Sequence, residues 1–155
     1  MLLDYVYVAA FVSFPDAVFI LLLGFNLSNI RDIKLSRFLV IGGIQSVVAL
    51  FVRMVNIYFG FHTIMQAISL YLLVMIFLKI KYYKAIIPVL IGILSQGIIQ
   101  STILPTIGVI FEFKMTDLYY SSMKLILANI PIFLVSLILL IAIKRKNLFL
   151  CDIND

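Results

Sequence analysis

The sequence has very few of the residues from which enzymes build active sites. Its 155 residues include one histidine, one cysteine and seven acidic side chains. A single thiol cannot close an internal disulfide, and one histidine with one cysteine cannot supply the several ligands of a zinc site. No glycine-rich phosphate-binding loop occurs either. The sequence therefore predicts a protein that is not an enzyme and that uses no metal and no cofactor.

Polar residues of every kind are scarce. Hydrophobic residues make up 65% of the chain and charged residues 12%, with a mean hydropathy of +1.22. This leaves too little polar surface to coat a soluble globule of this length. The net charge of +5 would suggest nucleic acid for a soluble protein, but here the basic residues flank apolar runs. The composition predicts an all-α integral membrane protein whose surroundings are the lipid bilayer and not nucleic acid.

The apolar runs are long enough to be counted as membrane spans. A hydrocarbon core of roughly 30 Å is crossed by about 20 residues of helix. On this measure the chain has five spans, at about residues 5–27, 38–57, 63–78, 85–104 and 123–143. They predict one domain of five transmembrane helices over residues 1–146, followed by a short cytoplasmic tail, 147–155, whose acidic end is expected to be disordered. Residues 105–122 are expected to form the one sizeable loop.

The basic residues predict the orientation of these spans. Most of them form three clusters, Arg31/Lys34/Arg37, Lys79/Lys81/Lys84 and Lys144/Arg145/Lys146. Lysine and arginine are retained on the cytoplasmic side during insertion. If all three clusters are cytoplasmic, the N-terminus lies outside and the C-terminus inside, in a bacterial cytoplasmic membrane.

Asp16 is the one acidic residue within a predicted span, and it directly follows Pro15. A charge at membrane depth costs about 2.5–3.5 kcal/mol, so it requires a partner, water or a function. In one interpretation Asp16 faces the interior of the bundle. In the other, a helix begins near Pro15, and Asp16 lies in its first turn, where it complements the helix dipole.

Several other polar residues are expected at one level, near the outer ends of the spans. His62 and Gln66, and likewise Gln96 and Gln100, are four residues apart and so share a helix face. The candidate ligand-binding residues are Asp16, Arg53, Asn56, His62, Gln66, Gln96, Gln100 and Lys124. Their positive balance would suit an anionic or carboxylate-bearing ligand. Alternatively, the glutamines form hydrogen bonds between helices, and Arg53 extends its side chain to the membrane surface.

Glycine and proline predict where the helices contact and bend. Gly42 and Gly43 in the second span, and Gly92 and Gly97 in the fourth, are expected at close helix contacts. Pro88 is expected near the start of the fourth span, where a proline is tolerated, and Pro131 is expected to kink the fifth.

Two short stretches resemble the N-terminal membrane region of Firmicutes sensor histidine kinases of the peptide-responsive, accessory-gene-regulator type. They are Phe14-Pro15-Asp16 with Gly24-Phe25-Asn26-Leu27, and Val52-Arg53 followed by Phe59-Gly60-Phe61-His62-Thr63. The resemblance covers roughly residues 5–146 and implies that Arg53, Gly60 and His62 belong to a signal-sensing surface. Such receptors continue into a kinase domain, whereas this sequence ends nine residues after Lys146. The resemblance therefore implies membrane sensing but not kinase activity.

The sequence thus favours a membrane sensor or regulatory subunit that recognises a small extracellular or membrane-borne signal and acts through a partner. Two other classes remain open. One is the substrate-binding subunit of a small-molecule transporter, and the other is a non-catalytic structural or immunity-type protein. The partner would be kinase-like for sensing or an ATPase subunit for transport, and a homodimer is compatible with the sequence.

Overall fold

A computed structural model describes residues 2–30, 32–54, 61–110 and 122–152 of the chain. All regular elements in this part are helical. In chain order they are α1 (Leu2–Val8), the π-helical segment η1 (Ala9–Ser13), α2 (Phe14–Leu27), α3 (Leu35–Met54), α4 (Phe61–Leu78), α5 (Tyr82–Ile110) and α7 (Ser122–Lys146). The predicted all-α class is confirmed for the described residues.

Four helical stretches are long and apolar enough to cross a membrane: Asp4–Leu27, Leu35–Met54, Tyr82–Ile110 and Ser122–Lys146. They correspond to the first, second, fourth and fifth predicted spans, as expected for a membrane-embedded protein. The third corresponds to α4, whose apolar stretch Thr63–Leu78 is shorter. A five-span count and the orientation of the bundle therefore stay predictions.

The two prolines of α5 do not interrupt it, and two predictions about this helix were wrong. Pro88 lies inside α5 and not at its start, and Pro105 is also internal, so the helix continues to Ile110 where a loop was expected. A proline removes one backbone hydrogen bond, but unwinding an apolar helix would leave several polar groups unpaired. Pro131 likewise lies inside α7.

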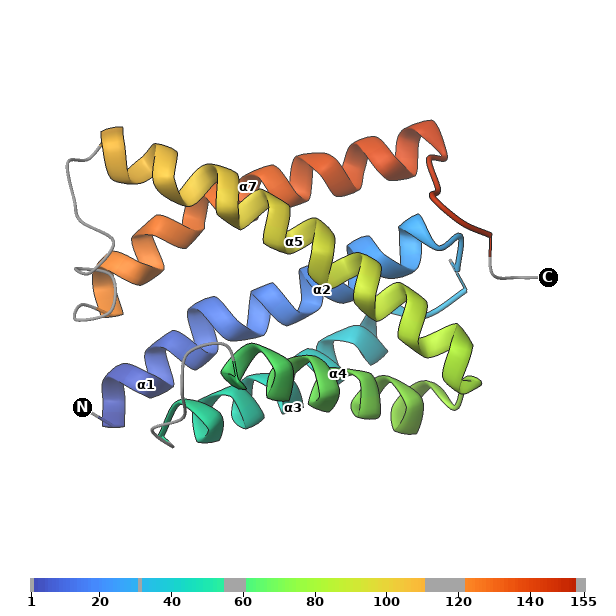
Figure 1. The fold of residues 1–155 in the computed structure, drawn as a ribbon, viewed down its shortest axis with the longest axis horizontal. Coiled ribbons are helices and arrows are strands. Elements are labelled where there is room, and N and C mark those ends of the chain that lie inside the picture. Colours follow the sequence, from blue (N-terminus) through green and yellow to red (C-terminus); the bar gives the residue numbers. More distant parts are fainter. Residues whose placement is uncertain (1, 31, 55–60, 111–121, 153–155) are drawn as a thin grey trace.

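Helix α2 is the centre of the bundle (Figure 1). It packs against α3, α5 and α7, while α4 packs against α3 and α5. Helix α1 continues through η1 into α2, so residues 2–27 form one uninterrupted helical rod. The rod places the mid-span residues of α2 next to three other helices.

The closest helix contact is the crossing of α2 and α5. A Cβ atom on Gly24 would lie 1.9 Å from the carbonyl oxygen of Pro88, and one on Gly92 would lie 2.0 Å from that of Ile20. The two backbones are therefore in direct contact, as predicted for Gly92. Gly42 contacts Val18, whereas a Cβ atom on Gly43 or on Gly97 would have no atom within 4 Å, so the prediction of a close contact was wrong for these two.

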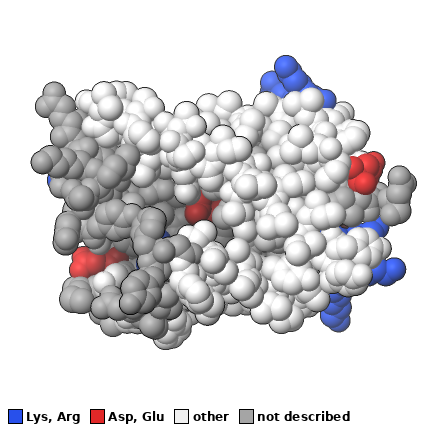
Figure 2. Space-filling model, in the orientation of Figure 1, with Lys and Arg blue, Asp and Glu red and all other residues white. Residues whose placement is uncertain are grey.

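Helices α2, α4 and α7 end on one side of the bundle, and α3 and α5 begin on the same side. We call this side the basic end. Lys34, Lys79, Lys84 and Lys144 all lie there, and Figure 2 shows Lys and Arg atoms concentrated on this side. The helices that end here close with a residue in the left-handed region, with φ of 57° at Asn29, 52° at Lys79 and 50° at Asn147. Such residues terminate helices by redirecting the chain.

The part of the tail that the structure describes, residues 147–152, contacts the end of α2. The amide nitrogens of Leu150 and Cys151 donate to the carbonyl oxygen of Leu27 at 2.7 and 3.4 Å. The side-chain amide of Asn29 donates to Asp152 Oδ2 at 2.8 Å. The described part of the tail is thereby attached to the end of α2.

Apolar side chains fill the half of the bundle next to the basic end. Leu21, Phe25, Ile41, Val74 and Val89 are almost fully buried there, in one cluster contributed by α2, α3, α4 and α5. Such a core resists solvent because its side chains interdigitate at close to crystal density. The polar residues of the spans gather in the other half.

Candidate functional site

A cavity of about 350 Å³ lies between α2, α3, α4, α5 and α7. Its polar lining residues are Ser13, Asp16, Gln45, Arg53, Thr63, Gln66, Gln96, Gln100 and Asn129. Apolar side chains such as Ile20, Leu70 and Ile93 close the end that faces the core cluster. Figure 2 shows acidic surface in a hollow near the middle of this face, surrounded mainly by uncharged atoms among those drawn in colour. A volume of this size suits a small-molecule ligand.

Asp16 enters the cavity from α2. The helix runs without a break from Leu2, so Asp16 lies in the middle of a rod and not at a helix start. The π-helical segment Ala9–Ser13 ends two residues before Pro15, and such a widened turn accommodates the backbone hydrogen bond that a proline lacks. Of the two interpretations of Asp16, the one in which it faces the interior of the bundle is the correct one.

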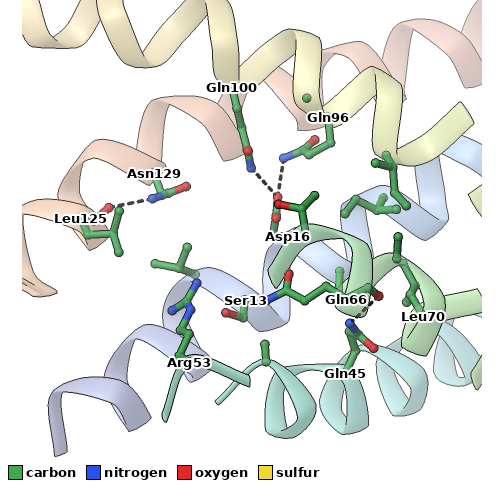
Figure 3. A pocket seen from close by; sticks show the side chains of 18 of the residues that line it. Ser13, Asp16, Gln45, Arg53, Gln66, Leu70, Gln96, Gln100, Leu125 and Asn129 are labelled. Atoms are coloured by element: carbon green, nitrogen blue, oxygen red, sulfur yellow. Dashed lines mark hydrogen bonds between the residues drawn. The ribbon is translucent and has the colours of Figure 1, made fainter. Parts of the chain in front are cut away.

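Two glutamines on α5 bind the same oxygen of Asp16. Gln96 Nε2 and Gln100 Nε2 donate to Asp16 Oδ1 at 2.8 and 2.9 Å. The spacing of four residues places both amides on one face of α5, as predicted. In Figure 3 the two dashed lines converge on Asp16. The glutamines thus form interhelical hydrogen bonds and also line the cavity.

The network continues to α7. Ser136 Oγ lies 3.0 Å from Gln96 Oε1 and donates to it, and it also lies 2.9 Å from the carbonyl oxygen of Ile132. Gln96 and Ser136 are both buried, with 1% and 0% of their surface exposed. A chain of polar contacts therefore links the Asp16 carboxylate on α2 to α5 and then to α7.

Arg53 approaches the cavity from α3. No hydrogen bond or direct ion pair joins its guanidinium to Asp16 in the described part of the chain, although the two opposite charges attract each other across the cavity. Figure 3 shows Arg53 on the side of Asp16 away from Gln96 and Gln100. The cavity thus presents an anionic and a cationic group that are separate from each other.

A second polar group joins α3 to α4. Gln45 Nε2 donates to the carbonyl oxygen of Gln66 at 3.0 Å, and Ser69 Oγ donates to Gln45 Oε1 at the same distance. Gln45 is buried, with 4% of its surface exposed. Both polar atoms of its amide are used, so Gln45 fixes the wall of the cavity.

Ser13 differs from the other helical serines. Ser46 and Ser101 donate to a carbonyl of the preceding turn, the usual arrangement for a serine inside a helix, and Ser69 and Ser136 have such a carbonyl and a glutamine oxygen within reach. Ser13 Oγ is buried and has no hydrogen-bond partner among the described residues. It lies at the end of the π-helical segment, one turn before Asp16. Ser13 lines the cavity, but its hydroxyl oxygen is covered by neighbouring atoms.

The structure brings together five of the eight predicted site residues: Asp16, Arg53, Gln66, Gln96 and Gln100 all line the cavity. Lys124 is exposed and does not line this cavity. Asn56 and the side chain of His62 lie outside the described part.

The prediction missed Ser13, Gln45, Thr63 and Asn129 as lining residues. Gln45 could have been found, because it precedes Ala49 and Arg53 by one and two helical turns and so shares their face. The role of Ser13 depends on the π-helical turn, for which the sequence gives no comparable signal.

Comparison of the chain with protein-family models, with curated proteins and with solved structures finds no match. The described residues define an all-helical protein with four helices able to span a membrane and an internal polar cavity. No group of three or more metal-ligating side chains occurs among the described residues.

Proposed function

We propose that this protein is a membrane-embedded sensor or regulatory subunit that binds a small molecule in the cavity and acts on a partner protein. In this proposal five helices cross a bacterial cytoplasmic membrane, with the N-terminus outside. The clustering of Lys34, Lys79, Lys84 and Lys144 at one end supports the orientation, because basic residues are retained on the cytoplasmic side. The cavity would then open in the outer half of the bundle.

The observation that carries the proposal is the pair of separated charges inside an apolar bundle. Asp16 and Arg53 both line the cavity, and neither contacts the other directly. Asp16 lies mid-span, where a charge costs about 2.5–3.5 kcal/mol, so a purely structural protein would be more stable with an apolar residue at that position. Binding of a ligand is the function that these charges best support.

The packing supports binding and signalling over passage through the membrane. Between the cavity and the basic end lie the crossing at Gly24 and Gly92 and the core around Leu21 and Phe25. The network from Asp16 through Gln96 to Ser136 also connects the cavity to α7, which ends at the basic end. A ligand that moved Asp16 would therefore act on α7 and on whatever partner contacts its end.

The test of binding is native mass spectrometry of the full chain in lipid nanodiscs, which detects a small molecule retained from the expression host or added from a metabolite extract. We expect such an adduct on the wild type and its loss in Asp16→Asn and in Arg53→Gln. Asp32→Asn and Arg37→Gln are matched controls, because they remove the same charges from exposed positions outside the cavity. Absence of any adduct on the wild type, or equal loss in the controls, would refute the proposal.

Signalling is tested separately from binding. Spin labels on a Lys146→Cys variant with Cys151→Ser and on Lys81→Cys would report the distance between the end of α7 and the α4–α5 connection. The extract that yields the adduct should change this distance. Accumulation of the bound compound inside vesicles that contain the protein and an ATPase partner would instead indicate a transporter subunit.

A further inference from the structure

Asp16 and Ser13 leave hydrogen-bonding capacity unused on one side of the cavity. Both glutamine amides bind Asp16 Oδ1, and no hydrogen bond to Oδ2 is formed within the described residues. Ser13 Oγ, one turn earlier on the same helix, is also unpaired within them. The second carboxylate oxygen of Asp16 is an acceptor suited to a protonated primary amine, which has three donors.

Arg53 provides the opposite chemistry from α3. A guanidinium carries five N–H donors in a planar fork that matches the oxygens of a carboxylate or a phosphate. None of these donors forms a hydrogen bond with a described residue, and the side chain lines the cavity. A ligand with only one charge would leave either Asp16 or Arg53 uncompensated, whereas a zwitterion would compensate both.

The wall of the cavity is open toward the surroundings of the bundle between α4 and α5. Gly97 on α5 and Thr63 on α4 both line the cavity and are exposed. A Cβ atom on Gly97 would meet no other described residue within 4 Å, so no described side chain fills the opening beside it. Figure 2 shows the hollow on the side face of the bundle rather than at an end.

The surface around this opening is apolar. Ile64 on α4 is 55% exposed, and Leu94 and Ile98 on α5 are 65% and 66% exposed. In a membrane these side chains face lipid, so a molecule that passes between them must carry an apolar part. The opening therefore favours a ligand that arrives from the bilayer over one that arrives from water.

We propose that the cavity binds a membrane amphiphile whose head group combines a primary ammonium with a phosphate or carboxylate. The ammonium lies against Asp16, the anionic group lies against Arg53, and the apolar chain leaves between α4 and α5 past Gly97. This inference rests on the proposed binding function and specifies the class of ligand.

The test is equilibrium binding of radiolabelled lysophosphatidylethanolamine to the full chain in phosphatidylcholine nanodiscs, with empty nanodiscs subtracted. We expect saturable binding that weakens roughly 30-fold or more in Asp16→Asn and in Arg53→Gln, because each leaves a buried charge unpaired. Lysophosphatidylglycerol, which has no ammonium, and water-soluble glycerophosphoethanolamine, which has no acyl chain, should both compete poorly.

Gly97→Leu tests the lateral opening. The leucine should fill the space beside the cavity and abolish binding. Gly43→Leu is the matched control. A Cβ on Gly43 would also meet nothing within 4 Å, but Gly43 does not line the cavity. If Gly97→Leu does not fold, as judged by size-exclusion chromatography, Thr63→Phe narrows the same opening from α4.

The outcomes separate this inference from the proposed function. Equal binding of lysophosphatidylglycerol would overturn the zwitterionic class, and equal binding of glycerophosphoethanolamine would overturn access from the bilayer. Failure of every probe, with a native adduct still lost in Asp16→Asn, would overturn the ligand class and leave the binding function intact. Failure of both measurements would overturn both.

Discussion

The contact of Gly24 with Pro88 and Gly92 makes a quantitative prediction about the stability of the bundle. An alanine at position 24 would place its Cβ 1.9 Å from the carbonyl oxygen of Pro88, where ordinary contacts begin at 3.4 Å. The helices α2 and α5 would have to separate by about 1.5 Å, and overpacking of this kind costs about 1–3 kcal/mol. Replacing glycine by alanine in a helix returns up to about 1 kcal/mol. We therefore expect Gly24→Ala to lower the free energy of unfolding by about 1–2 kcal/mol.

Gly92 provides an internal check, because it lies on the other side of the same crossing. A Cβ there would lie 2.0 Å from the carbonyl oxygen of Ile20, so Gly92→Ala should cost about as much as Gly24→Ala. Once the helices have separated for one methyl group, the second needs little further movement. The double variant should therefore lose less stability than the sum of the two single variants, with an interaction energy of about 0.5–2 kcal/mol.

Gly43→Ala and Gly97→Ala are the controls, since neither new methyl group would meet an atom within 4 Å. Both should leave stability unchanged or raise it by up to about 1 kcal/mol, the gain in helix propensity. The assay is equilibrium unfolding in mixed detergent micelles, followed by circular dichroism. Equal losses in all four variants, or strict additivity at positions 24 and 92, would refute direct backbone contact between α2 and α5.

Three further predictions concern the polar network and the tail. Gln96→Leu removes one of the two donors to Asp16 and leaves the buried carboxylate less well paired. The free energy of unfolding should therefore fall by about 1–3 kcal/mol in the same assay. No change would show that the hydrogen bond is not formed. Cys151 should react with a membrane-impermeant maleimide in inside-out vesicles and not in intact cells, as expected for a cytoplasmic tail; labelling in intact cells would reverse the proposed orientation. Asp152→Ala removes the exposed hydrogen bond from Asn29 and should change the free energy of unfolding by less than about 1 kcal/mol. It should also increase the rate at which the half-buried Cys151 is labelled. An unchanged rate would mean that Asp152 does not hold the tail.

Composition and charge pattern were enough to predict the class of fold. The length of an apolar run and the basic residues at its ends are local properties, so they can be counted without knowledge of how helices pack. The predicted first and second spans, and most of the fourth and fifth, correspond to helices that can cross a membrane. The error at Pro105 arose because proline breaks helices in water more readily than in apolar surroundings.

The sequence also identified part of the cavity. Polar residues are conspicuous in apolar helices, and the spacing of four residues correctly paired Gln96 with Gln100. Lys124 was included because it lies near the end of a span, but position along a helix does not determine which way a side chain points. A membrane helix that is apolar on every face carries no sequence pattern that shows how it is rotated about its own axis. The sequence therefore says little about which of its residues contact the neighbouring helices.

Only the tertiary structure decided what the polar residues do. The continuous rod of residues 2–27 turns Asp16 inward, and the π-helical turn leaves the Ser13 hydroxyl unpaired within the described residues. The close crossing at Gly24 and Gly92 sets how α5 is rotated against α2, and this rotation brings both glutamines to one oxygen of Asp16. The sequence by itself determined that the chain forms helices long and apolar enough to cross a membrane, because this property depends on composition and run length. The cavity depends on contacts between residues far apart in the chain, which packing alone brings together.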